Sequence, residues 1–154
     1  MNKILLVLAF ILISFSSFGQ YKEQFRAMHG YEMGIDKGFF GINFTGEYFP
    51  LNYFSIAPSF TFFTPATGNA RGFDLNARYY FTEKERQWYT TVGYGHYTRV
   101  YEFNPIGRES FNSLNLGGGS MIKLNDEIGL NPEVRYQLGR NDLLFKLSIL
   151  YFVN

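Results

Sequence analysis

The sequence contains no cysteine among its 154 residues. Disulfide bonds, thiol nucleophiles and lipid attachment through a cysteine are therefore excluded. Charged side chains are also sparse, at 18% of the chain, whereas soluble domains carry about 25%. The 14 basic and 13 acidic side chains nearly balance. We therefore expect no nucleic-acid partner, because nucleic-acid binding requires a basic surface.

Long apolar runs are missing too, except for residues 4–13 near the N-terminus. Ten helical residues at about 1.5 Å each cannot cross a hydrocarbon layer of roughly 30 Å. Lys3 precedes the run, and Ser17 and Gly19 supply the small residues that a signal peptidase needs. We therefore predict a secretory signal peptide over residues 1–19. Cleavage before Gln20 would leave a glutamine at the N-terminus of the mature chain, and in this feature the chain resembles exported proteins of the Bacteroidota. We expect residues 20–154 to form one domain.

This domain is rich in aromatic residues, which make up 20% of the chain, and in short runs of alternating apolar and polar residues. Successive strand side chains point to opposite faces, so each run predicts a strand with one apolar and one polar face. Turn-forming or charged residues separate the runs. Eight runs follow one another: 27–35, 38–48, 54–62, 73–81, 88–100, 114–124, 130–138 and 145–153. The first is less regular than most, and 88–100 is ambiguous because His96 and Thr98 share the face of Trp88.

The residues on the two faces of these runs indicate which face points outward and which points into the barrel. The apolar face carries large residues in nearly every run, and eight strands leave too little interior space for so many. The polar face carries mainly Gly, Ser, Thr, Asn, Tyr and scattered ions, which suit a narrow filled interior. The predicted fold class is therefore all-β: a closed antiparallel up-and-down transmembrane β-barrel of about eight strands, apolar side outward. A soluble lipocalin-like binder of a small ligand, with the opposite orientation, is the alternative.

The leader, the eight runs and the closing segment 143–153 together resemble the small OmpX- and OmpA-type outer-membrane barrels. Members of that family commonly end on an aromatic residue, whereas this chain ends Tyr151-Phe152-Val153-Asn154. The resemblance implies the outer membrane of a Gram-negative bacterium as location. The implied partners are outer-membrane lipids, lipopolysaccharide, the insertion machinery and an envelope protein. We expect a non-enzymatic, envelope-structural or surface-interaction role without a cofactor, using the loops 65–71 and 103–110.

Charged residues on the polar face are the first candidate site. An isolated ion in a low-dielectric interior is costly, so opposite charges should pair across strands. We predict a salt-bridged plug that fills the lumen, in preference to a narrow porin-like ion path. Its members are Glu32, Glu47, Asp74, Arg78, Lys123, Glu133, Arg135 and Lys146.

His96, Thr98 and Glu102 form a weaker candidate catalytic site. A His with a hydroxyl residue two positions on, and an acid beyond, resembles the His-x-Ser and downstream Glu of outer-membrane lipid A deacylases. In such a site the His activates the hydroxyl and the acid orients the His. The alternative function is therefore a lipid A-modifying hydrolase. The competing interpretation is a polar His and Thr beside an aromatic belt at the membrane interface.

Two further features are expected to be structural. His29 has no second ligand at metal-binding spacing, so we expect no metal site. Gly117, Gly118 and Gly119 lack the following Lys-Ser/Thr of a phosphate-binding loop. They instead favour a bulge, tight strand curvature or a bulky neighbour from across the lumen.

Overall fold

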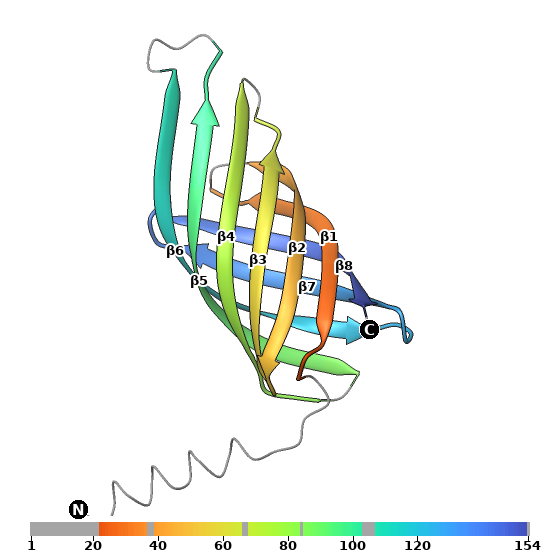
Figure 1. The fold of residues 1–154 in the computed structure, drawn as a ribbon. Helices are drawn as coiled ribbons and strands as arrows, with labels where there is room; N and C mark the ends of the chain where they lie inside the picture. Colours follow the sequence, from red (N-terminus) through yellow and green to blue (C-terminus); the bar gives the residue numbers. More distant parts are fainter. Residues whose placement is uncertain (1–21, 37–38, 66–67, 84, 103–106, 154) are drawn as a thin grey trace, which may run out of the picture.

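Eight antiparallel β-strands account for most of the residues that the computed structural model describes, which are 22–36, 39–65, 68–83, 85–102 and 107–153. Each strand pairs with its neighbours in the sequence, and β1 pairs with β8, so the sheet closes into a barrel (Figure 1). The strands are β1 (Phe25–Gly34), β2 (Phe40–Leu51), β3 (Phe54–Phe63), β4 (Asn69–Tyr80), β5 (Arg86–Val100), β6 (Arg108–Lys123), β7 (Ile128–Gln137) and β8 (Asp142–Val153). The predicted fold, a closed antiparallel barrel of eight strands, is confirmed. The predicted signal peptide lies outside the described residues.

The alternation in the sequence becomes a lumen face and an outer face. Along β3, every second side chain from Ser55 to Phe63 is buried, and the residues between them are exposed. The buried face of this strand is largely polar, whereas Ile56, Phe60 and Phe62 are exposed. The barrel therefore has its large apolar side chains outside and its polar ones inside, the reverse of a soluble barrel.

The hairpin of β5 and β6 is the longest in the barrel, with strands of 15 and 16 residues. At the end opposite the start of β1 it extends beyond β7, whose last residue Gln137 lies opposite Asn115, whereas β4 reaches as far as β5 (Figure 1). Its register runs without a break from Arg86 opposite Ile122 to Val100 opposite Arg108. The sequence predicted a loop up to Ser110, but pairing begins already at Arg108. β6 therefore begins earlier than expected, whereas β5 ends at Val100 as the sequence predicted.

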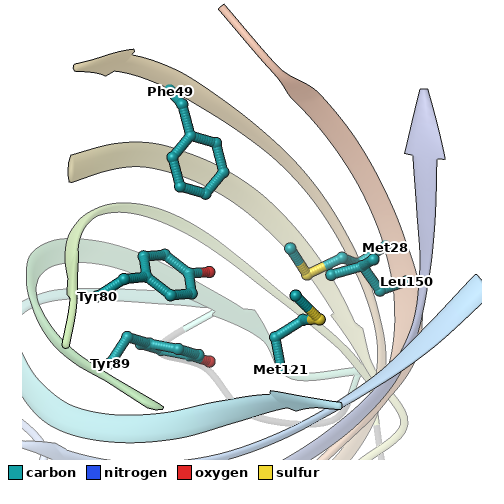
Figure 2. Close-up of a cluster of buried hydrophobic side chains, with 6 residues drawn as sticks. All are labelled: Met28, Phe49, Tyr80, Tyr89, Met121 and Leu150. Atoms are coloured by element: carbon teal, nitrogen blue, oxygen red, sulfur yellow. The ribbon is translucent and has the colours of Figure 1, made fainter. Parts of the chain in front are cut away.

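An apolar cluster fills the lumen at the end where β1 begins. Figure 2 shows the packed side chains of Met28, Phe49, Tyr80, Tyr89, Met121 and Leu150. Tyr53 and Phe152 pack against this cluster. The rings of Phe49 and Tyr80 lie 5.3 Å apart, and those of Tyr80 and Tyr89 lie 5.0 Å apart. Aromatic pairs at these distances are favourable beyond their burial alone. Within the described part of the chain, no helix is long and apolar enough to cross a bilayer.

Candidate functional site

A continuous chain of ion pairs occupies the middle of the lumen. Arg78 lies between two carboxylates, with Nη1 3.3 Å from Glu47 Oε1 and Nη2 2.5 Å from Glu133 Oε2. Glu133 Oε1 is in turn 2.9 Å from Nε of Arg135. Arg135 then reaches Glu32 Oε2 at 2.8 Å through Nη2. Each of these charges is buried, so each needs its opposite partner in this low-dielectric interior.

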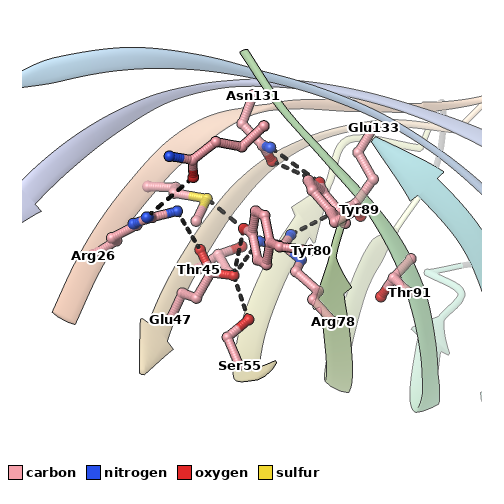
Figure 3. A network of polar contacts seen from close by, with 12 residues as sticks. Arg26, Thr45, Glu47, Ser55, Arg78, Tyr80, Tyr89, Thr91, Asn131 and Glu133 are labelled. Carbon is pink, nitrogen blue, oxygen red and sulfur yellow. Dashed lines mark hydrogen bonds and ion pairs between the residues drawn. The ribbon is translucent and has the colours of Figure 1, made fainter. Parts of the chain in front are cut away.

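Neutral donors add hydrogen bonds to two of the buried carboxylates, Glu47 and Glu133 (Figure 3). Ser55 Oγ and the Tyr80 hydroxyl donate to Glu47 Oε1 at 2.6 and 2.7 Å. The Tyr89 hydroxyl donates to Glu133 Oε2 at 2.5 Å. These donors come from β3, β4 and β5, while the carboxylates come from β2 and β7. The network therefore links strands on opposite sides of the barrel.

Aromatic rings and arginine side chains close both ends of this network. At the end where β1 begins, the Arg26 guanidinium lies 4.4 Å from the centre of the Phe49 ring. At the opposite end, the Arg140 guanidinium lies 4.4 Å from the centre of the Phe39 ring and also contacts the rings of Phe63, Tyr97 and Phe111. Burial lowers the pKa of Arg140, which lies in the turn before β8. Both ends of the lumen are thus filled with side chains.

Seven of the eight charges that the sequence assigned to the lumen are buried there: Glu32, Glu47, Asp74, Arg78, Glu133, Arg135 and Lys146. Lys146 donates to Thr45 Oγ1 at 2.7 Å. Lys123 is the exception, because its side chain is 40% exposed and pairs with Asp126 at 2.7 Å. It is the last residue of β6, where the strand leaves the barrel wall. Its position at the rim removes it from the network.

The structure adds two charges to the lumen that the sequence did not assign. Arg26 is buried and lies 3.9 Å from Glu47. Asp142 is buried, accepts a hydrogen bond from the Asp36 backbone N–H and lies 3.6 Å from Arg140. Both residues lie at strand ends outside the predicted runs: Arg26 precedes the first run, and Asp142 was placed in the connection before the last one. Continuing the alternation by one residue beyond Ala27 would have found Arg26.

A second polar cluster lies on the outer face of β5 and β6, and we call its members, His96, Thr98, Ser110 and Asn112, the outer polar cluster. His96 pairs with Asn112 across the two strands, and Thr98 pairs with Ser110. His96 Nδ1 is 2.7 Å from Asn112 Oδ1, Thr98 Oγ1 is 3.5 Å from His96 Nε2, and Ser110 Oγ is 3.2 Å from Thr98 Oγ1. The four side chains therefore form one line of polar contacts.

The protonation of His96 follows from this geometry. An amide oxygen only accepts, so Nδ1 carries the proton and donates it to Asn112. In the neutral ring Nε2 is then the acceptor, and it faces the Thr98 hydroxyl. This is the arrangement of a general base beside a hydroxyl group.

The predicted acid of this site, Glu102, takes no part in the cluster. It is exposed in the segment after β5, while the imidazole is bonded to Asn112. The sequence suggested Glu102 because it follows closely, but the partner comes from the neighbouring strand through the register of β5 and β6. Ser110 and Asn112 are thus the residues that sequence reasoning missed.

The remaining candidates lie apart from both sites. The His29 ring stacks on Tyr151 with centres 5.6 Å apart. Among the described residues, no group of three His, Cys, Asp or Glu side chains is placed to hold a metal ion. Gly118 lies under a groove of about 650 Å³ on the outer face, which is lined mainly by apolar residues, among them Trp88, Ile122 and Val134. At Gly117 and Gly119, by contrast, an added Cβ would clash with the Val134 carbonyl oxygen and with the Tyr89 hydroxyl, so these two glycines allow neighbouring groups to approach closely.

No protein-family model matches the chain, and no curated protein matches it either. Solved structures do resemble it. The N-terminal β-barrel domain of Pseudomonas aeruginosa OprF matches with a TM-score of 0.75 at 15% identity, covering 87% of this chain and 100% of that one. A de novo designed transmembrane β-barrel matches with a TM-score of 0.68 at 9% identity, covering 88% and 100%.

A third structure is Ail, the attachment invasion locus protein of Yersinia pestis. It matches with a TM-score of 0.56 at 16% identity, covering 85% of this chain and 98% of that one. At these identities the likeness establishes the fold alone. The chain is thus similar in fold, over most of its length, to small outer-membrane β-barrels.

Proposed function

We propose that this chain is an outer-membrane barrel that is closed to solutes and serves the envelope as a structural or surface-interaction protein. The observation that carries this proposal is the inverted distribution of polarity. Large apolar side chains such as Phe44, Leu75 and Leu147 are exposed, whereas Glu47, Arg78 and Arg135 are buried. The exposed apolar side chains are stable in contact with lipid, and the buried charges are stable in a filled lumen where they pair with one another.

The same distribution argues against the soluble alternative. A lipocalin-like binder needs an apolar lumen with room for a ligand. Here the middle of the lumen holds the ion pairs of Arg78 and Arg135, and both ends are filled with aromatic rings. In water, the outer face would be an apolar patch far larger than monomeric soluble proteins expose.

The filled lumen also argues against a channel. An ion that entered would have to displace Arg78 or Arg135 from their carboxylate partners, which is costly in a low-dielectric interior. The proposed role therefore belongs to the outer surface and to the predicted loops 65–71 and 103–110. The strand ends Asn69, Val100 and Arg108, within or beside them, lie at the same end of the barrel. Export through the leader 1–19, insertion by the outer-membrane machinery and contact with lipopolysaccharide are parts of this proposal.

The proposal is tested by membrane fractionation, gel mobility and conductance of the purified full chain. We expect the protein in the outer-membrane fraction and a change in gel mobility between unheated and boiled samples, because a closed barrel resists detergent until heated. In a planar bilayer we expect no steady conductance. A soluble product without a mobility change would refute the barrel in the membrane, and a stable open conductance would refute the closed lumen.

A further inference from the structure

The outer polar cluster interrupts an otherwise apolar surface. On β7 and β8 the outward residues are apolar from Ile128 to Leu138 and from Leu143 to Val153. On β5 and β6 the last apolar outward pair is Tyr94 with Leu114, and the next two pairs are His96 with Asn112 and Thr98 with Ser110. The polar cluster therefore begins directly beyond the apolar band, at the level where hydrocarbon gives way to lipid headgroups. The ester bonds of membrane lipids lie at this level.

We propose that the outer polar cluster is an acyl-transfer site that cleaves ester bonds of lipids reached from the membrane side. The proposal rests on the membrane location proposed above and adds a reaction to it. Ser110 is the nucleophile, because this residue is exposed on the outer face, whereas Thr98 is only 7% exposed. Thr98 Oγ1 lies between the two reacting groups, 3.2 Å from Ser110 Oγ and 3.5 Å from His96 Nε2.

The proposed reaction transfers protons along this line. Ser110 Oγ attacks the ester carbonyl carbon and forms the new C–O bond. Its proton passes to Thr98 Oγ1 while the proton of Thr98 passes to His96 Nε2, and the carbonyl π electrons move to the oxygen. When the intermediate collapses, the ester C–O bond breaks and the leaving alcohol takes the proton back by the same route. Water then attacks acyl-Ser110 in the same way, releasing the fatty acid and restoring Ser110.

Two neighbours give this site further support. Asn112 acts as a positioning residue, because its Oδ1 holds the proton of His96 on Nδ1 and keeps Nε2 available. Arg71 is exposed on the outer face of β4 directly beside Thr98. It makes no hydrogen bond or ion pair with any residue that the structure describes. Its guanidinium can therefore stabilise the oxyanion that develops on the ester.

The first test uses a fluorophosphonate probe on the purified full chain in detergent, with the heat-dependent mobility change as the measure of barrel formation. We expect the wild type to be labelled and Ser110→Ala to remain unlabelled. Ser120→Ala changes a serine on the same strand outside the cluster, and it should be labelled like the wild type. Labelling of a folded Ser110→Ala variant would overturn the assignment.

The second test measures release of fatty acid from vesicles of phosphatidylethanolamine and phosphatidylglycerol. His96→Ala should lower the rate about a hundred-fold or more, the usual contribution of a general base. His29→Ala changes the other outward-facing histidine and should leave the rate unchanged. Thr98→Ser should retain activity and Thr98→Val should lose it, because only the former can relay a proton. Full activity of Thr98→Val would overturn the relay.

The role of Asn112 is tested by rescue. Asn112→Ala should lose activity, whereas Asn112→Asp keeps an acceptor for Nδ1–H and should restore it; equal loss in both variants would overturn the positioning role. A wild-type chain that shows the mobility change but neither labelling nor hydrolysis overturns the site and leaves the barrel intact. A wild-type chain without the mobility change overturns both proposals, because the cluster depends on the pairing of β5 with β6.

Discussion

Polar side chains gather in two regions of this barrel, the lumen and the outer end of the β5–β6 hairpin, and they differ in how they are satisfied. In the lumen, Glu133 contacts Arg78, Arg135 and Tyr89, so this buried carboxylate has two opposite charges and a neutral donor. On the outer face, His96 and Ser110 form hydrogen bonds with the short neutral side chains of Asn112 and Thr98. The groups of the lumen network thus bind one another, whereas the outer polar cluster leaves the exposed Ser110 available to another molecule.

This difference indicates that the lumen network contributes to the stability of the barrel, whereas the outer polar cluster is the region suited to a reaction. Buried ions that satisfy one another fix the relative positions of strands, but they offer nothing to a ligand. A base and a hydroxyl at an exposed boundary add little to stability and can act on a molecule that arrives from outside. A departure from strand alternation is therefore a better indication of function in this barrel than the number of charges.

The largest expected effect comes from breaking the lumen network at Arg135. Arg135→Ala leaves Glu32, Glu133 and Asp74 without a buried cation that lies 2.8, 2.9 and 3.5 Å from them. Loss of one partner of a buried pair costs about 3–5 kcal/mol. We expect the free energy of unfolding, measured by urea titration in detergent, to fall by that amount. Arg108→Ala, at the exposed start of β6, is the control, and an equal loss there would contradict the comparison.

The next effect concerns the outer face. Leu147 is 52% exposed near the middle of β8, and Leu147→Arg should destabilise the barrel in lipid vesicles by about 2–4 kcal/mol, the cost of an arginine near the bilayer centre. Leu51→Arg, at the end of β2, should cost at most about 1 kcal/mol because it lies near the interface. In a soluble barrel both changes would be harmless. Equal, negligible effects in the unfolding titration would therefore contradict the lipid-facing orientation.

The sequence predicted much of the fold, because strand alternation is a local property. The inward positions of Glu47 and Arg135 follow from parity within single strands. Lys123 has the same parity as Met121, yet it pairs with Asp126 outside the lumen, since parity does not tell where the barrel wall ends. Such limits depend on how all eight strands are staggered, which no single run contains.

In the outer polar cluster, too, the residues of one strand could be predicted from the sequence, and their partners on the next strand could not. His96 and Thr98 could be selected from one strand, as a histidine and a hydroxyl on one face. Their partners Asn112 and Ser110 could not, because they depend on the register between β5 and β6. Glu102 was chosen by nearness in sequence, whereas Asn112 is near in space. Cross-strand register was thus the missing information.

A smaller effect is expected from a single donor in the lumen. Tyr89→Phe removes the hydroxyl that donates to Glu133 at 2.5 Å and also contacts Asn131. Arg78 still donates to the same oxygen of Glu133, so the change removes one hydrogen bond to a charged group, which contributes about 1.5–3 kcal/mol. The unfolding titration should show a loss in this range. Tyr94→Phe, on the outer face of the same strand, should change the free energy of unfolding little. A larger loss for Tyr94→Phe would reverse the contrast between the two faces.

The smallest effect is expected from the ion pair outside the lumen, between Lys123 and Asp126. The hydrogen bond and charge of Lys123 lower the pKa of the Asp126 carboxyl, so any stabilisation exists above the ordinary pKa of aspartate and fades as the pH falls through the lowered value. Asp126 is fully exposed, so water and salt screen the pair. We expect Asp126→Asn to leave the unfolding midpoint at neutral pH unchanged. A shift as large as that of Tyr89→Phe would mean that the rim, and not only the lumen, holds the barrel together.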